Sequence, residues 1–271
     1  MKHYSSIALI ISAIFSSCSY QQAYYVSPFN GNSNTYHATP LLSDSVKSAI
    51  YLSGNMYSGS ANYNGSDDVI NFEGDVYRTQ QFGLLEAYYG LNASFGNYDV
   101  AELDSDYTYS TVNYQLINSM AGSKSFGGVG AEGGINFTLP MAHGEWRLFG
   151  MEVSSHKEFG SYLDFRNLLP DSAATLIIKN SFFSTLGFYS ELVKKVKHGS
   201  YGFRIASGTI LESAYHNLNI YDNTGSDLKF RYTDLTFDYT WEQWTGYIQS
   251  KSATKASGVK LGIIYRLGKM E

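Results

Sequence analysis

A strict alternation of apolar and polar residues, repeated in short segments from Ser48 to the C-terminus, constrains the fold of this chain more than any other feature. Successive side chains of a β-strand point to opposite faces, so a period of two predicts strands with one apolar and one polar face. The run from Val129 to Leu139 alternates over a length that would cross a bilayer. Comparable runs start at Leu85, Leu235 and Val259.

About ten such segments can be placed along the chain, or eight if those around Ile70 and Trp244 lie in loops. No apolar run of the roughly 18 residues that a membrane helix needs is present beyond the N-terminal stretch. The 24 Tyr, 16 Phe and 26 Gly, with 4 Pro and 16% charged residues, suit many strands that face something other than water. We therefore expect an all-β fold, a transmembrane antiparallel up-and-down β-barrel.

The links between these segments alternate in length. Bacterial membrane barrels join their strands by short turns on one side and long loops on the other, so this order favours a barrel over a β-sandwich. The short links fall at Gln80-Gln81, Met141 to Gly144, Lys194 to Gly199 and Glu242-Gln243, and the longer ones at 59–68, 97–124, 157–179, 211–226 and 252–258.

The N-terminus has the pattern of an export signal. Lys2 precedes an apolar stretch from Ile7 to Phe15 that is too short to span a bilayer, which predicts a signal peptide over residues 1–17. Cys18 comes next and is the only cysteine, so no intramolecular disulfide can form. Its position resembles a bacterial lipoprotein cleavage box, which implies a covalent lipid on Cys18; ordinary cleavage nearby, with an incidental cysteine, is the alternative.

Residues 18–47 differ from the rest of the mature chain. They are rich in Ser, Asn, Tyr and Gly, contain Pro28 and Pro40, and show no sustained period. Such composition indicates an extended segment without regular structure. We expect a lipidated tether over residues 18–47 that leads to the barrel over residues 48–271.

Two sets of residues are expected on the outer surface. Trp146, Trp241 and Trp244 lie beside short links, where the aromatic belt of a membrane–water interface would place them, although the core of a soluble barrel is the alternative. The apolar faces of the strongest segments should contact lipid; they include Ile135, Phe137, Leu235, Phe237, Leu261 and Ile263.

The polar faces, which should line the lumen, carry more acids than bases. Unpaired charges away from water are costly, so water or protons must accommodate several of them. Two interpretations remain open, a hydrated ion-pair network that fixes the barrel and a narrow cation-preferring pore. The residues are Glu73, Asp75, Glu86, Glu132, Glu152, Glu191, Asp234 and Asp238 against Arg204, Lys260 and Arg266.

Candidate catalytic groups are few. Ser154 and His156 share one strand face near Glu158, as a lipid hydrolase would need, but a histidine at the loop end of a strand is more typical of a surface residue. No spacing suggests a metal site, and a net charge of −5 argues against a nucleic-acid binder. Apart from the lipid, we expect no cofactor.

The sequence resembles the small outer-membrane β-barrel proteins and lipoproteins of Bacteroidota-type bacteria. The resemblance rests on Ser17-Cys18, Tyr25-Val26-Ser27-Pro28, Pro40-Leu41-Leu42, Ser48 to Gly54 and the closing segment Gly258 to Gly268. It implies an outer-membrane barrel with outer-membrane lipids around it and no catalytic residues. Surface-exported members carry acidic residues after the cysteine, and Ser19 to Ala23 has none, which implies an anchor in the periplasmic leaflet.

We therefore expect a non-enzymatic accessory or structural subunit of a larger outer-membrane complex for secretion, protein insertion or uptake. Its partners would be other outer-membrane or periplasmic proteins. Tyr98, Tyr107, Tyr109 and Tyr114 are the expected contact residues, because aromatic side chains are enriched in protein interfaces; a loop that only folds over the barrel mouth is the alternative. The alternatives are a small ligand-binding or conducting barrel, which requires an open lumen, and a lipid hydrolase around His156.

Overall fold

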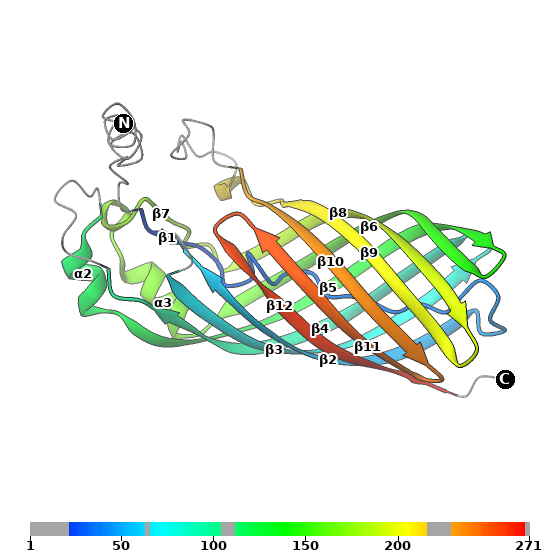
Figure 1. Ribbon diagram of the computed structural model, residues 1–271. Helices are drawn as coiled ribbons and strands as arrows, with labels where there is room; N and C mark the ends of the chain where they lie inside the picture. The colour runs from blue at the N-terminus through cyan, green and yellow to red at the C-terminus, as the bar shows by residue number, and fades with distance from the viewer. Residues whose placement is uncertain (1–21, 63–65, 104–111, 216–228, 269–271) are drawn as a thin grey trace, which may run out of the picture.

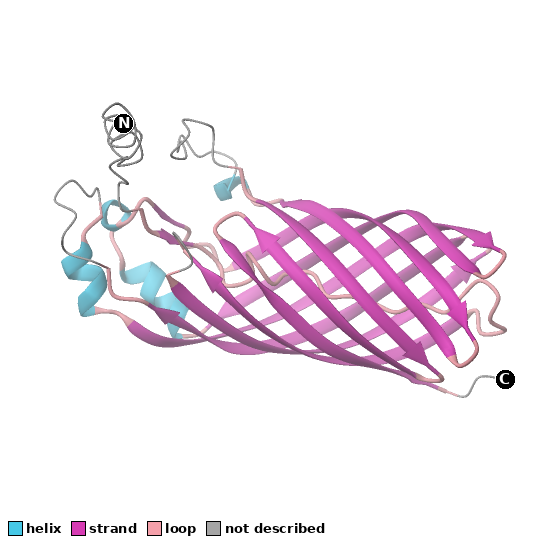
Figure 2. Cartoon of the chain, viewed as in Figure 1, coloured by secondary structure: helices cyan, strands magenta, loops and turns pink. Residues whose placement is uncertain are grey.

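The computed structural model describes residues 22–62, 66–103, 112–215 and 229–268. Ten antiparallel strands form one closed barrel in which neighbours along the chain are neighbours in the sheet (Figures 1 and 2). The predicted up-and-down barrel is confirmed, with ten strands rather than eight. They are β2 (Ser48–Ala61), β3 (Asp67–Phe82), β4 (Leu85–Val100), β5 (Gly122–Met141), β6 (Gly144–Phe159), β8 (Phe182–Val196), β9 (Gly199–Ile210), β10 (Arg231–Trp241), β11 (Trp244–Ala253) and β12 (Ala256–Leu267).

The two ends of the barrel differ. At one, which we call the turn end, two-residue turns join the strands at Gly83-Leu84, Ala142-His143, Lys197-His198 and Glu242-Gln243. At the other, the cap end, most links are longer, and they hold α2 (Tyr114–Ser119), α3 (Ser161–Leu168), η2 (Asp171–Ala173), β7 (Leu176–Ile177) and η3 (Ser213–Tyr215). The predicted alternation of link lengths is confirmed except at 252–258, where a two-residue turn at Thr254-Lys255 replaces the expected longer link. Gln80-Gln81 lies within β3, and Gly83, with φ of 65°, makes the turn after it.

The described helices are short, and none of them is both long and apolar enough to cross a membrane. The outer surface of the strands is apolar instead. The six residues expected to contact lipid all face outwards, with exposed fractions from 37% for Phe137 to 58% for Phe237. All eleven polar residues expected inside are buried. The alternation in the sequence thus predicted both faces of the wall correctly.

We expect an arginine on the outer face of this wall to block folding into lipid. Phe237→Arg places a charge midway along β10 on a face expected to contact hydrocarbon, at a cost of roughly 2–4 kcal/mol near the bilayer midplane, and Phe137→Arg, opposite Leu85 at the start of β4, should cost less. Folding is measured in lipid vesicles by heat-modifiable migration in gels. Leu168→Arg is the control, since Leu168 is 73% exposed on α3, outside the strands. Equal folding of all three variants would contradict the assigned outer face.

A bulge interrupts the alternation in β6. The pairing of β6 with β8 shifts between Arg147 and Gly150, so Leu148 and Phe149 both face outwards. A β-bulge adds one residue to a strand and reverses the faces beyond it. As a result Arg147 points into the lumen, whereas strict alternation from Phe149 and Met151 would put it on the outer face.

The N-terminal segment is not a tether outside the barrel, and that expectation is wrong. Residues 23–40 run through the lumen, and every residue from Ala23 to Ala38 is buried (Figure 1). At the cap end, β1 (Tyr24–Tyr25) pairs in parallel with β7 in a separate two-stranded sheet. The absence of a period reflects a segment that is surrounded by wall and cap side chains on all sides rather than one that is solvated.

Candidate functional site: the plugged lumen

Residues 23–40, which we call the plug, cross the whole barrel. At the cap end the Ala23 N–H donates to Thr175 Oγ1 at 3.2 Å. At the turn end the chain leaves the lumen beside β6, where the Leu42 N–H donates to Glu145 Oε2 at 2.8 Å. An eight-stranded barrel has an interior that side chains alone can fill, so ten strands leave room for one extended chain. In the described structure the lumen is therefore closed by the plug.

The wall carboxylates accept hydrogen bonds from consecutive plug residues. Hydrogen bonds to charged groups are stronger than neutral ones, so this series fixes the register of the plug against the wall. The contacts are Asn34 Nδ2 to Glu152 (3.3 Å), Thr35 Oγ1 to Glu73 (2.7 Å), Tyr36 Oη to Glu191 (3.0 Å), His37 Nε2 to Glu132 (2.7 Å) and Thr39 Oγ1 to Glu86 (3.0 Å).

The basic residues of the wall bind the plug backbone. Lys251 Nζ donates to the Asn34 carbonyl at 2.6 Å, Lys260 Nζ to the Asn32 carbonyl at 3.3 Å, and Arg147 Nη2 to the Thr39 carbonyl at 3.2 Å. These carbonyls receive no hydrogen bond from a neighbouring strand, and the side chains supply the missing donors. The wall thus supplies both acceptors and donors to a segment that has no regular structure of its own.

The same bases pair with wall acids. Arg147 lies within 3.5 Å of Glu86, 3.0 Å of Glu145 and 2.9 Å of Glu191, while Arg204 pairs with Glu152, Lys251 with Asp234 and Lys260 with Glu73. Acids still outnumber bases. Among the described residues eleven carboxylates are buried, against six arginines and lysines. The interior therefore has a marked acidic excess.

Aromatic packing holds the plug at the cap end. The Phe29 ring stacks on His156 at 4.7 Å and meets Phe126 edge-on at 5.9 Å, and Tyr25 meets Phe165 of α3 edge-on at 5.1 Å. Burial raises the pKa of Tyr162 on α3 well above that of an exposed tyrosine, so its hydroxyl keeps its proton. The cap is a small apolar core built around the start of the plug.

The glycine-rich run of β5 makes room for this packing. A Cβ at Gly128 would approach Phe29 Cζ to 2.5 Å, and one at Gly134 would approach Tyr88 Cε1 to 2.5 Å. Contacts this short are not tolerated. The contact between Gly128 and Phe29 could not be predicted from the sequence, because Phe29 belongs to a segment that shows no period.

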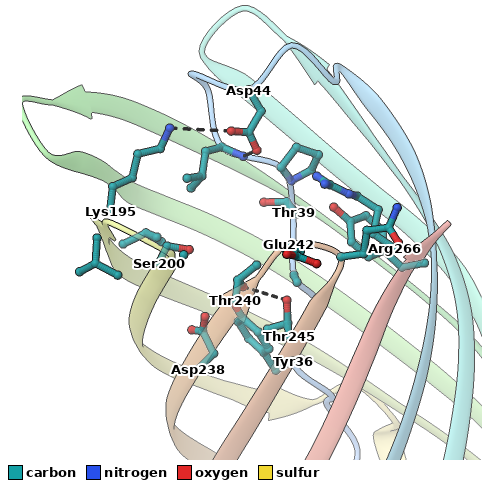
Figure 3. Close-up of a pocket in the computed structure, with 18 of the residues that line it drawn as sticks. Tyr36, Thr39, Asp44, Lys195, Ser200, Asp238, Thr240, Glu242, Thr245 and Arg266 are labelled. Carbon is teal, nitrogen blue, oxygen red and sulfur yellow. Dashed lines mark hydrogen bonds and ion pairs between the residues drawn. The ribbon is translucent and has the colours of Figure 1, made fainter. Parts of the chain in front are cut away.

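A cavity of about 230 Å³ lies at the turn end, between the exit of the plug and strands β8 to β12 (Figure 3). It is lined by groups of both charges, including Asp44, Lys195, Asp238, Glu242 and Arg266. Lys195 Nζ pairs with Asp44 at 3.8 Å, which ties the chain after the plug to the end of β8. The cavity is therefore the mouth of the closed lumen.

The expected contact tyrosines do not form one surface. Tyr98 is 2% exposed, stacks on Tyr162 at 3.9 Å and donates to Asp67 at 2.9 Å, so it belongs to the interior and is closed to a partner. Tyr114 starts α2 and is partly buried against the cap core. Tyr107 and Tyr109 lie outside the described residues.

The three tryptophans lie on the outer face at the turn end. Trp146, Trp241 and Trp244 are each between 37% and 41% exposed. Trp146 Nε1 donates to Ser190 at 3.0 Å, and the Trp244 ring lies 4.5 Å from that of Tyr265. This arrangement excludes a core position within the barrel, and their role at a membrane interface stays a prediction.

The expected hydrolase residues are engaged with the plug. His156 is 1% exposed beneath Phe29, and its Nε2 lies 3.2 Å from the Ser33 carbonyl, so the expected surface position is wrong. Because β6 extends to Phe159, position 156 falls on the inner wall. Ser154 shares that wall, but its Oγ bonds to Asn34 and Thr185 at 2.8 Å each. A lipid substrate could not reach either group.

Sequence reasoning missed several residues of the lumen, namely Arg147, Lys251, Glu145, Glu158 and Asp67. Lys251 lies inside because β11 continues to Ala253, through positions that the sequence had left close to a loop. The sequence carries no signal for the two-residue turn at Thr254-Lys255, because it contains none of the Gly, Asn or Asp residues that mark such turns, although Lys255 adopts a φ of 61° there. Within the described residues, no group of three or more His, Cys, Asp or Glu side chains is placed to hold a metal ion.

Comparison with known proteins gives no family. No family model matches the chain, and no curated protein matches it. Solved barrels align over most of their length but weakly. The KdgM porin is 6% identical, and the alignment covers 79% of this chain and 98% of the porin with a TM-score of 0.28. The β domain of the Bordetella autotransporter BrkA is 8% identical, with 82% of this chain and 99% of that chain covered and a TM-score of 0.40. The Pseudomonas putida toluene transporter TodX is 10% identical, with 93% of this chain and 99% of that chain covered and a TM-score of 0.33.

Proposed function

We propose that this chain is an outer-membrane β-barrel that works as a closed, cation-preferring channel, with residues 23–40 as its gate. The proposal takes up the conducting alternative that the sequence left open rather than the accessory subunit. It rests on one observation, an acidic lumen that is filled by a segment of the same chain through non-covalent contacts.

The barrel does not depend on the plug for its strand pairing. β12 pairs with β2 over twelve residue pairs, from Ala256 with Ala61 to Leu267 with Ile50, and the plug contributes no strand to the closed sheet. Withdrawal of the plug would break side-chain and carbonyl contacts and the two-residue pairing of β1 with β7, but no ladder of the closed barrel. This favours a removable gate over a permanent part of the wall.

The charge of the lumen favours cations. The plug contains no Asp, Glu, Lys or Arg, so the excess of buried carboxylates over arginines and lysines belongs to the wall and its cap and would remain after opening. Rings of Asp and Glu side chains select cations in other pores. An anion entering the same lumen would meet uncompensated negative charge.

An outer-membrane location fits the apolar outer face and the predicted export signal, because closed barrels leave no unpaired strand edge in lipid. The lipid on Cys18 stays a prediction, since Cys18 lies outside the described residues. The accessory-subunit role gains nothing from the geometry, because Tyr98 faces inwards.

We expect the full chain to conduct only rarely in planar bilayers, and a variant with its plug released to carry a steady cation current. A protease site inserted in the connection after the plug, at residues 43–46, would allow cleavage after folding. Hydrogen bonds to charged groups are each worth about 1.5–3 kcal/mol and the plug makes several, so urea is raised stepwise until the cleaved plug is lost while the barrel stays folded. A KCl gradient gives the selectivity from the reversal potential.

A disulfide provides the matched control. In a Cys18→Ala background, Asn34→Cys with Thr185→Cys joins the plug to β8, since the two native side chains meet at 2.8 Å. Cleaved and oxidised protein should stay closed, and reduction should open it. A folded barrel that has lost its plug and still carries no current would reject the channel, and an anion-selective current would reject the cation preference.

A further inference from the structure

We propose that the lumen binds one alkali cation, Na⁺ or K⁺, at a site formed by Asp75, Asn92 and Ser53. These residues lie on three neighbouring strands, β3, β4 and β2. In the register of the sheet Asp75 is directly opposite Asn92 on one side and Ser53 on the other. Directly opposed residues have Cβ atoms roughly 4.5–5.5 Å apart, so their oxygens can meet at one ion.

The polar atoms of this row lack protein partners. Neither carboxylate oxygen of Asp75 accepts a hydrogen bond of good geometry, and the same holds for Ser53 Oγ and for both amide atoms of Asn92, although Glu73 lies close enough to act on Asp75 and Tyr247 close enough to act on Ser53. Asn55, one row towards the cap end on β2, is in the same condition. Asp75, Asn92 and Asn55 are 3%, 6% and 7% exposed. Buried polar groups are normally paired, so this cluster calls for a ligand.

The charges around Asp75 point to a positive ligand. Glu73 and Glu132 both act on Asp75 with negative charge. The nearby bases are already engaged, because Lys260 pairs with Glu73 at 3.3 Å and His37 lies 2.7 Å from Glu132. None of the described Lys, Arg or His side chains forms an ion pair with Asp75, and the single positive charge of Lys260, which also acts on Asp75, cannot offset both Glu73 and Asp75.

The donor set selects the class of ion. One carboxylate with hydroxyl and amide oxygens is a hard, weakly charged set, whereas transition metals prefer nitrogen and sulfur donors and calcium sites contain several carboxylates. A monovalent cation balances one carboxylate. This assignment names the ion that the proposed channel would hold and in that sense rests on the proposed function, but binding is measured in the closed state without any current.

The test uses the full folded chain in detergent. Thermal unfolding is followed by tryptophan fluorescence as N-methylglucamine chloride is replaced by NaCl or KCl at constant total salt. Ligands that bind only the folded state raise the midpoint with their concentration. We expect the midpoint to rise in the wild type and not in Asp75→Asn, which keeps the shape of the side chain. Asp234→Asn, whose native partner is Lys251, should keep the response.

Three outcomes would overturn the site. An equal response of the wild type and Asp75→Asn would place the effect elsewhere. An absence of any response in the wild type, with Asp75→Asn more stable in every salt, would mean that Asp75 and Glu73 share a proton instead of binding an ion. Stabilisation by micromolar Ca²⁺ in place of Na⁺ would reject the monovalent assignment. None of these outcomes depends on whether the plug moves.

Discussion

A cysteine at position 22 should react with a membrane-impermeant maleimide from the same side of the membrane as a cysteine at position 168, and not from the side of position 143. Gln22 begins the described chain next to Ala23, which bonds to Thr175 and Leu176 of the cap. Leu168 ends α3 at the cap end, and His143 lies in a turn at the turn end. The plug therefore carries the N-terminal end of the chain across the full height of the barrel.

The measurement uses intact cells and the three single-cysteine variants in a Cys18→Ala background. The result can be interpreted without knowing which end of the barrel faces outwards. It depends only on whether position 22 is labelled together with position 168 or with position 143. Labelling of Gln22→Cys together with His143→Cys would place the N-terminus at the turn end and would refute the path of the plug. The same positions should all react after the membrane is permeabilised.

The path of the plug also bears on the expected lipid anchor. Cys18 lies outside the described residues, but four residues of chain reach at most roughly 14 Å, and the hydrocarbon core of a bilayer is about 30 Å thick. A lipid on Cys18 should therefore enter the leaflet on the cap side. If the long links face outwards, as is usual for such barrels, we expect an outer-leaflet anchor in place of the periplasmic-leaflet anchor that the sequence suggested.

The sequence predicted the wall well because each strand records its two environments directly. Phe137 and Phe237 contact the outside while Glu132 and Asp238 face the lumen, and a period of two separates them without any knowledge of the partner strands. The plug left no such trace. Its residues contact all sides of a polar lumen, so Asn34, Thr35 and His37 look like those of a solvated linker.

Arg147 shows the other limit of a sequence-based prediction. The bulge at Leu148 and Phe149 is a property of two paired strands, and it turns inwards a residue that strict alternation would put on the outer face. The missed residue is the most highly connected base of the described lumen, since it joins three carboxylates and one plug carbonyl. Its replacement consequently gives a large expected effect.

Replacing Arg147 by leucine should destabilise the folded barrel by about 3–5 kcal/mol, the usual cost of removing one partner from a buried charge cluster. The change leaves Glu86, Glu145 and Glu191 without their shared counter-charge at the turn end of the lumen. Arg147→Lys keeps the charge but not the planar fork that serves several acceptors, so an intermediate loss is expected. Urea midpoints in lipid vesicles, read by tryptophan fluorescence, give the differences.

Arg78→Leu is the matched control, because Arg78 is exposed on β3 and contacts only Ser48 among the described hydrogen bonds of its side chain. It should change stability little. A second variant separates charge from packing: with Glu86, Glu145 and Glu191 all changed to glutamine, the loss caused by Arg147→Leu should shrink, since no buried anion is left uncompensated. If that loss stays the same in the glutamine background, Arg147 acts through packing, and the acidic excess of the lumen is not what determines the stability of its turn end.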